Sequence, residues 1–168
     1  PEPPVWECTL TTWNANGLRR RRHVGNLSSF LRHHARTDIL HITETKCSPS
    51  MIPRPEAFRA MLHAWGFRYI AMFWCPTKPN ESGSLVACKF EPTRSTFGFA
   101  SKSPATNEGR CITLQFSAFT GIFTYTPTTN LQGDNIARRE RYNKAFEEHV
   151  MTERSRRDAP LLIGGDFN

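Results

Sequence analysis

The sequence predicts a layered α/β domain, in which helices pack against the faces of β-sheets. Three observations support this fold class. Short apolar runs outnumber segments with helical spacing, turn-forming Pro, Gly and Asn residues separate them, and no repeat or linker divides the 168 residues. Hydrophobic residues make up 38% of the chain, which is enough for a core, so we expect residues 1–168 to belong to one domain.

The first part of the chain predicts a strand, a helix and a second strand. Residues 6–13 are rich in β-favouring side chains and run up to a polar turn, which is typical of a strand. The apolar residues of 26–35 fall on one helical face, with Asn26 as the expected N-cap. Residues 38–43 contain a short apolar run bounded by polar residues and predict a buried strand.

The middle of the chain predicts a helix followed by two strands. Three prolines indicate a loop before residues 56–65, whose apolar residues recur at helical spacing. Residues 68–74 predict a strand, and a loop rich in Pro, Asn and Gly follows it at 76–83. The apolar run in residues 85–90 predicts the next strand.

The last part of the chain predicts two neighbouring strands, a long helix and a final strand. Residues 110–116 and 121–125 are strands joined by a short connection, so we expect them to pair antiparallel. Residues 136–154 have helical spacing with alternating charges. The final strand, 161–163, leads into a Gly-Gly-Asp-Phe-Asn sequence at 164–168.

The charge balance indicates a polyanionic partner. The chain has 22 Lys and Arg against 15 Asp and Glu, a net charge of +7, with four of the arginines consecutive at 19–22. A basic surface favours nucleic acid, since neutralised phosphates supply most of the binding free energy. The alternative is an arginine run that is only a solvated loop. No segment approaches the roughly 20 apolar residues of a membrane helix, so we expect no membrane partner.

The cysteines favour a reducing compartment. The five cysteines are an odd number with irregular gaps and no CxxC pair, so they indicate neither a zinc site nor a disulfide framework. Several lie in apolar runs, as buried thiols do. We therefore expect an intracellular protein and, given the predicted nucleic-acid partner, a nuclear one.

Polar side chains with oxygen-bearing groups follow four of the predicted strands. Open α/β sheets place their sites at such strand ends, although polar residues also end strands for purely structural reasons. Carboxylate and amide oxygens suit Mg²⁺, whereas zinc or copper would need clustered His or Cys. A Mg²⁺ ion beside basic residues is suited to splitting phosphate esters. The residues are Asn14, Asn16, Glu44, Tyr125, Asp166 and Asn168.

Six short motifs, in order and with matching gaps, resemble the endonuclease/exonuclease/phosphatase family, in its exonuclease III and abasic-site endonuclease branch. The motifs are TWNANGLR at 12–19, HITETK at 41–46, ESGSLVACK at 81–89, EGR at 108–110, YTP at 125–127 and GGDFN at 164–168. The resemblance implies a two-sheet α/β sandwich of the DNase I-like type with its site at one end of the sheets. It also implies a fold that is incomplete at the C-terminus, because the later Asp/Asn pair and the closing Asp-His motif of the family have no counterpart here.

The resemblance assigns roles to individual residues. Glu44 and Asn16 would be at the metal, with Mg²⁺ as the expected ion and Mn²⁺ as an alternative. Asn14, Tyr125, Asp166 and Asn168 would be the catalytic residues: Tyr125 at the scissile phosphate, Asp166 activating the water nucleophile, and Asn168 holding it. The expected nucleic-acid contacts are Arg19, Arg20, Arg21, Arg22, Lys46 and Arg110.

The family pattern is not matched at every position. Asn16 stands where many relatives have Asp, and Thr43 replaces the Gln that usually precedes the metal-binding Glu. None of the six histidines lies in a catalytic context, and His41, on a predicted buried strand, is expected to be a core residue rather than a general base.

The function expected from the residues and the resemblance together is Mg²⁺-dependent cleavage of DNA, by an abasic-site endonuclease or the endonuclease module of a LINE-type retrotransposon. Residues 1–168 alone are expected to be inactive, and no obligate protein partner is expected. Two alternatives stay open. One is a phosphoinositide or sphingolipid phosphoesterase of the same superfamily, and the other is a non-catalytic remnant that binds nucleic acid.

Overall fold

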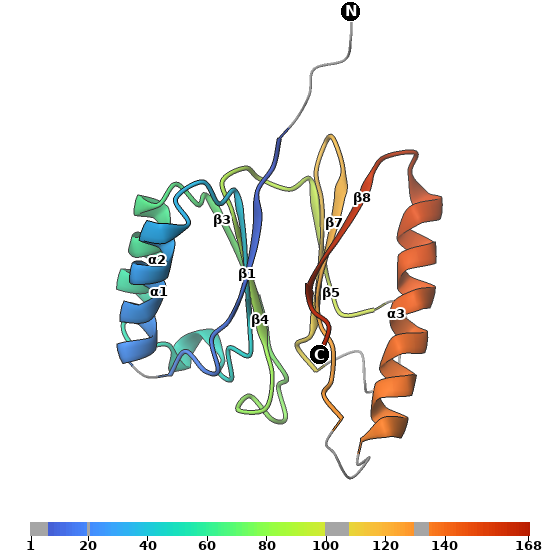
Figure 1. Ribbon diagram of the computed structural model, residues 1–168, viewed down its shortest axis with the longest axis horizontal. Helices are drawn as coiled ribbons and strands as arrows, with labels where there is room; N and C mark the ends of the chain where they lie inside the picture. Colours follow the sequence, from blue (N-terminus) through green and yellow to red (C-terminus); the bar gives the residue numbers. More distant parts are fainter. Residues whose placement is uncertain (1–6, 20, 100–107, 130–134) are drawn as a thin grey trace, which may run out of the picture.

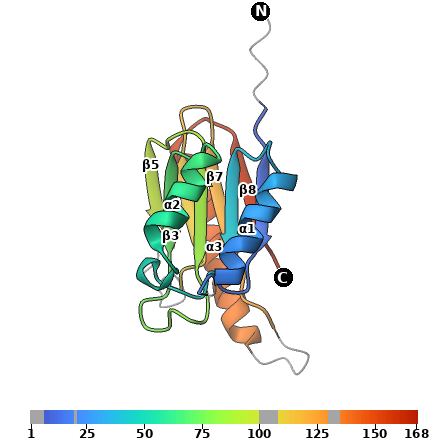
Figure 2. The same cartoon turned by 90° about the vertical axis from the view of Figure 1, so that its left-hand side faces the viewer.

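The computed structural model describes residues 7–19, 21–99, 108–129 and 135–168. Two four-stranded sheets lie face to face, with helices α1 and α2 on the outer side of one sheet and α3 on the outer side of the other (Figure 1). Figure 2 shows α1 and α2 side by side in front of the first sheet. The elements are β1 (Leu10–Asn14), α1 (Arg21–His33), β2 (Ile39–Thr43), the short 3-10 helix η1 (Pro49–Met51), α2 (Pro55–Ala64), β3 (Tyr69–Phe73), β4 (Ser84–Cys88), β5 (Arg94–Phe97), β6 (Cys111–Gln115), β7 (Thr120–Tyr125), α3 (Ile136–Arg156) and β8 (Leu161–Asp166).

The two sheets have matching strand patterns. The first has the order β1-β2-β4-β3 and the second β5-β6-β7-β8. In each, one pair at the edge is parallel, β1 with β2 and β7 with β8, and the other neighbours are antiparallel. The register aligns Asn14 with Thr43 in the first sheet and Tyr125 with Asp166 in the second. The last residues of each parallel pair therefore lie side by side at one end of their sheet.

Three apolar layers hold the sandwich together. The first lies between the outer helices and the first sheet and includes Leu27, Leu31 and Leu62, all fully buried or nearly so. The second lies between the two sheets, with Ile112 and Phe123 at 0% exposure. The third, beneath α3, is built on the following residues: Phe99, Cys111, Ile122, Tyr142 and Ala145. Burial of this apolar surface is the main stabilising contribution to the fold.

The α/β sandwich expected from the sequence is confirmed, with differences at the ends of elements. The predicted helix at 26–35 begins earlier, at Arg21, so Asn26 lies inside α1 and its prediction as the N-cap is wrong. The first strand covers Leu10–Asn14 instead of 6–13, and residue 6 lies outside the described part of the chain. Strand β5 was not predicted because its four residues are mostly exposed and polar at the edge of the second sheet.

Strand β8 also runs further than expected, through Gly164 and Gly165 to Asp166. Gly165 is required by close packing against backbone, and Gly164 packs against a side chain. A Cβ at Gly164 would collide with the side chain of Leu10 on β1, and a Cβ at Gly165 would collide with the backbone oxygen of Thr124 on β7. The two glycines thus allow β8 to approach both neighbours and to deliver Asp166 at the strand's end.

The predicted states of the cysteines and of His41 agree with the structure. All five cysteines are free thiols, and burial raises the pKa of Cys47 to about 11 and that of Cys111 to about 12. His41 is fully buried in β2, which lowers its pKa to about 3 and keeps it neutral. Among the described residues, no helix is both long enough and apolar enough to span a membrane.

Candidate active site

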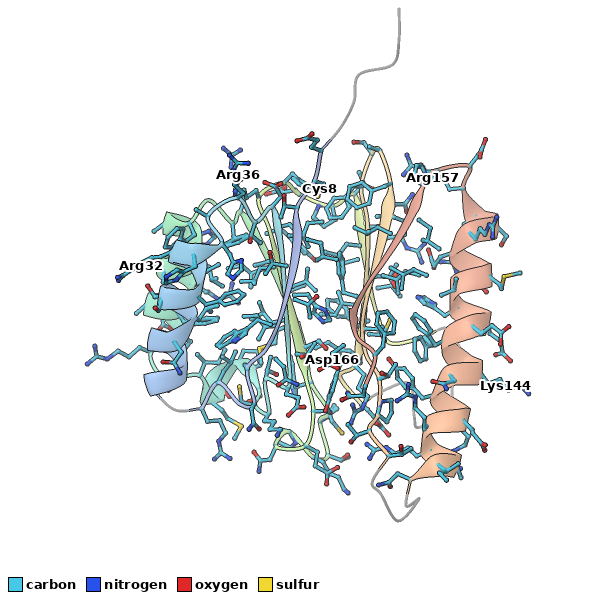
Figure 3. All side chains as sticks on the ribbon, viewed as in Figure 1. Cys8, Arg32, Arg36, Lys144, Arg157 and Asp166 are labelled. Atoms are coloured by element: carbon cyan, nitrogen blue, oxygen red, sulfur yellow. The ribbon has the colours of Figure 1, made fainter. Side chains whose placement is uncertain are left out.

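Four polar side chains meet where β1, β2, β7 and β8 end. Asn14, Tyr125 and Asp166 are the last residues of their strands, and Glu44 directly follows β2. Figure 3 shows Asp166 between the two sheets towards one end of the molecule, away from Cys8 and Arg36 at the other end. The rigid sheets therefore position side chains from both halves of the sandwich at one place.

Asn14 joins the two carboxylates. Its Nδ2 donates to Glu44 Oε1 at 2.9 Å and to Asp166 Oδ2 at 3.0 Å. Its Oδ1 accepts a hydrogen bond from the backbone N–H of Asn16 at 3.0 Å, which fixes the orientation of the amide. Because one nitrogen contacts both carboxylates, Glu44 and Asp166 are close enough to act on a single phosphate group.

Tyr125 contacts the same carboxylate from the second sheet. Its hydroxyl donates to Glu44 Oε1 at 3.0 Å. Burial raises the pKa of the Tyr125 phenol above its ordinary value, the charge of Arg110 opposes this, and the charge of Glu44 adds to it. Tyr125 is therefore a neutral hydrogen-bond donor at physiological pH.

Lys46 lies on the outer side of Glu44. Its Nζ is 2.7 Å from Glu44 Oε2 and donates to Asn16 Oδ1 at 2.6 Å. Partial burial of Glu44 opposes its ionisation, but hydrogen bonds from Lys46, Asn14 and Tyr125 outweigh burial and leave its pKa below the ordinary value. Glu44 is therefore ionised at neutral pH.

Asp166 and Asn168 are held by the strand end and the loop that follows β7. Thr126 donates from both its backbone N–H (2.9 Å) and its hydroxyl (3.0 Å) to the backbone oxygen of Asp166. Asn168 donates from its backbone N–H to Asp166 Oδ1 at 3.3 Å and from its side chain to Thr126 O at 3.0 Å. The other oxygen of the Asp166 carboxylate, Oδ2, accepts from Asn14 Nδ2 and, at 3.5 Å, from the Thr43 hydroxyl.

The sequence pattern of the Endonuclease/Exonuclease/phosphatase family matches residues 11–168. The chain belongs to this family.

Two curated relatives are similar in sequence over nearly the whole chain. The DNA repair nuclease APEX1 of Danio rerio is 28% identical over 166 residues, which cover 95% of this chain and 48% of that protein. An exodeoxyribonuclease of Bacillus subtilis is 26% identical over 160 residues, covering 95% of this chain and 58% of that one. The chain thus spans about half the length of these relatives.

Solved structures share the fold. A 3′-5′ exonuclease, NExo, from Neisseria meningitidis superimposes with a TM-score of 0.72 at 25% identity, over 95% of this chain and 57% of that one. An AP endonuclease from Archaeoglobus fulgidus gives a TM-score of 0.69 at 20% identity, over 87% of this chain and 52% of that one. The two-sheet architecture is therefore that of the family's nucleases.

The backbone of the two loops at the site is strained, as is common at functional sites. Asn16, Glu44 and Lys46 all have left-handed φ angles, of 44°, 52° and 50°. Hydrogen bonds between the two loops hold this conformation, including Gly17 N to Glu44 O at 2.7 Å and the backbone N–H of Ala15 to Thr43 O at 3.0 Å. The strain turns the side chains of Asn16, Glu44 and Lys46 towards one another.

The donor set fits a hard divalent cation of the kind that the family resemblance implies. No three His, Cys, Asp or Glu side chains cluster into a metal site in the described part of the chain. However, a Glu44 carboxylate oxygen and the Asn16 amide oxygen already converge on one cation, the Lys46 ammonium group. Oxygen ligands with few carboxylates are the usual environment of Mg²⁺, which keeps several of its waters.

Arg110, one of the predicted nucleic-acid contacts, is buried in the structure. Its side chain is 5% exposed, its Nε is 2.8 Å from Glu108 Oε2, and its guanidinium lies 4.4 Å from the centre of the Tyr125 ring. Arg138 of α3 also donates to Glu108, at 3.0 and 2.6 Å. Arg110 thus lies buried between Glu108 and the Tyr125 ring, where it supports Tyr125, and its contact with DNA stays a prediction.

Among the other predicted DNA-binding arginines, Arg19 directly follows the site's first loop. Arg19 is exposed and donates to Asn80 Oδ1 at 2.9 Å. Arg20 lies outside the described residues, and Arg21 and Arg22 begin α1 instead of lying on a loop.

Sequence reasoning missed Arg139, which secures the strand end. Its guanidinium donates to the backbone oxygens of Pro127 (2.8 Å), Phe167 (2.8 Å) and Asn168 (3.1 Å). Three arginines lie near the start of the 136–154 helix, but nothing in their spacing indicates which end of the second sheet they reach.

Proposed function

We propose that the chain carries catalytic residues of a metal-dependent phosphodiesterase that cleaves DNA, in the manner of a DNA repair nuclease. The observation that carries this proposal is the hydrogen bonding of the Asn14 amide to both Glu44 and Asp166, with Tyr125 on the same Glu44 oxygen. Membership of the family, and relatives named as DNA repair nucleases and exonucleases, support DNA as the substrate.

The residues divide the chemistry between them. Glu44 and Asn16 would hold Mg²⁺, or Mn²⁺ in its place, and the bound ion would supply positive charge to balance the phosphate oxygens. Asp166 accepts a proton from a water molecule whose oxygen attacks phosphorus, while one P–O ester bond breaks and the departing oxygen takes up a proton from solvent. Tyr125 and Asn14 are neutral donors that stabilise charge on the phosphate oxygens. Asn168 positions the nucleophile beside Asp166.

Positive charge supplies the affinity for the polyanionic substrate. The net charge is +7, and Arg19 is exposed directly after the first loop of the site, with Arg21 and Arg22 opening the next helix. Contacts of this kind position the DNA backbone, and binding should weaken steeply with salt. We propose an intracellular, nuclear protein on the basis of this substrate and the free thiols.

Because residues 1–168 alone are expected to be inactive, the test uses a full-length version of the protein with an abasic-site duplex oligonucleotide and Mg²⁺, and compares the unchanged sequence with Glu44→Gln. Glu44→Gln should remove Mg²⁺-dependent cleavage, whereas Lys89→Met, which removes a lysine ion-paired to Asp38 away from the site, should keep it. Cleavage at the unchanged rate in Glu44→Gln would reject the metal role.

Two further measurements separate the alternatives. Salt-sensitive DNA binding without any Mg²⁺-dependent cleavage would favour the non-catalytic, nucleic-acid-binding alternative. Release of phosphate from phosphoinositide vesicles, with no cleavage of DNA, would favour the lipid phosphoesterase.

A further inference from the structure

Lys46 already contacts the two oxygens assigned to the metal. Its ammonium is 2.7 Å from Glu44 Oε2 and 2.6 Å from Asn16 Oδ1. The pair is partly shielded, with the Lys46 side chain 31% exposed and that of Glu44 16% exposed. These distances are those of charge-assisted hydrogen bonds, which are stronger than neutral ones.

The backbone holds Lys46 in this position. The N–H of Lys46 donates to Ser82 O at 2.8 Å, and that of Thr45 donates to Gly83 O at 3.0 Å, so the loop before β4 anchors the segment. Lys46 also has a left-handed φ of 50°. The fold therefore fixes the backbone from which the Lys46 side chain reaches the two oxygens.

Glu44 carries one negative charge and Asn16 is neutral. The single positive charge of Lys46 therefore neutralises these two side chains. Each of these oxygens has two lone pairs, but an ammonium group and a divalent ion at the same two oxygens would lie close together and repel each other. We therefore expect a metal ion that binds Glu44 and Asn16 to favour a position of the lysine that is turned away from them.

We propose that Lys46 is an internal competitor of the metal, which occupies the metal-binding oxygens in the metal-free protein and is displaced when the ion binds. The displaced ammonium then faces the DNA phosphate beside the site. This inference rests on the proposed metal role of Glu44, and it links metal binding to the availability of a phosphate contact.

The first experiment measures Mn²⁺ binding to the 168-residue chain, without DNA, from the electron paramagnetic resonance signal of free Mn²⁺. Lys46→Met should bind Mn²⁺ roughly three- to tenfold more tightly, since the competing ion pair is removed. Lys89→Met is the matched control, because the Lys89 side chain is also 31% exposed and is ion-paired to Asp38 at 3.4 Å. Its Mn²⁺ affinity should stay within about twofold of the unchanged chain.

The second experiment separates displacement from a general effect of charge. Acetylation of lysine amines is followed by mass spectrometry with and without Mg²⁺. Addition of Mg²⁺ should speed the acetylation of Lys46 and leave that of Lys89 unchanged, and Glu44→Gln should abolish the effect. Circular dichroism confirms that each variant is folded.

The outcomes distinguish the two proposals. If Glu44→Gln weakens Mn²⁺ binding but Lys46→Met does not strengthen it, and Mg²⁺ leaves the acetylation of Lys46 unchanged, the competition is disproved and the metal role of Glu44 stands. If Glu44→Gln leaves Mn²⁺ binding unchanged, or no form of the chain binds Mn²⁺, the metal site and the competition fail together.

Discussion

The hydroxyl of Tyr125 donates a 3.0 Å hydrogen bond to Glu44, from one sheet of the sandwich to the other. Glu44 Oε1 also accepts from Asn14, so this oxygen receives one donor from each sheet. The site is therefore assembled across the two sheets, and each of its side chains can be tested separately.

Tyr125→Phe removes this donor and leaves the aromatic ring against Arg110 in place. We expect kcat of the active nuclease to fall roughly 10- to 100-fold, because a hydrogen bond to a charged group contributes about 1.5–3 kcal/mol. Single-turnover cleavage of an abasic-site oligonucleotide measures the effect. Tyr142→Phe is the control, since the Tyr142 hydroxyl bonds to Thr124 beneath α3; it should lower stability by about 1 kcal/mol and leave kcat unchanged.

Asn14→Asp replaces a shared donor with a third carboxylate beside Glu44 and Asp166. Repulsion should lower the unfolding free energy of the metal-free chain by about 1 kcal/mol, and millimolar Mg²⁺ should restore it. Thermal unfolding with and without Mg²⁺ measures both changes. Asn16→Asp is the matched variant, because its new charge lies beside the Lys46 ammonium; a loss of stability as large as that of Asn14→Asp would contradict the geometry described.

Arg110→Met leaves Glu108 with Arg138 as its remaining partner. Removal of one member of a buried ion pair should cost about 3 kcal/mol in urea unfolding, and Arg138→Met, at a site 30% exposed, at most about 1 kcal/mol. DNA affinity, measured by fluorescence anisotropy on folded protein, should fall less in Arg110→Met than in Arg19→Met. A larger loss of DNA affinity in Arg110→Met than in Arg19→Met would indicate that Arg110 contacts DNA directly.

Acid should destabilise the fold through His41. Burial lowers the pKa of His41 from 6.5 to about 3, so the unfolded chain binds a proton that the folded chain excludes between these values. The contribution of neutral His41 to the free energy of unfolding is fully present above about pH 6.5 and is lost as pH falls towards 3. The free energy of unfolding changes through this group by at most about 1.4 kcal/mol per pH unit. His41→Leu should make the free energy of unfolding less dependent on pH, as measured by urea unfolding at several pH values. His33→Asn, on the surface, should leave this pH dependence unchanged.

The parts of the fold that could be predicted from sequence are those whose pattern is set by burial. The strand at 38–43 was recognisable because every residue of β2 is buried, and the antiparallel pair β6 and β7 because its connection is short. By contrast, β5 is an exposed edge strand of four residues that is held only by its pairing with β6. Such pairing depends on a distant partner and leaves little local pattern.

The same reasoning applies to the site. Asn14, Glu44, Tyr125 and Asp166 could be predicted to meet because each is tied to the end of a strand, and parallel strands place such ends together. The burial of Arg110 could not be predicted, since its side chain lies against the Tyr125 ring and against Glu108, which Arg138 of α3 also contacts. Long-range ion pairs of this kind carry no local signature.

The apolar layer between the sheets also sets the spacing of the candidate site. Asn14 and Glu44 belong to one sheet and Tyr125 and Asp166 to the other, so the thickness of the layer around Ile112 and Phe123 sets the gap across which these groups must meet. A substitution there that thickens or thins the interior by a methyl group would shift the reacting groups relative to each other without touching any of them. In this molecule, the geometry of the candidate site and the volume of the interior are therefore coupled.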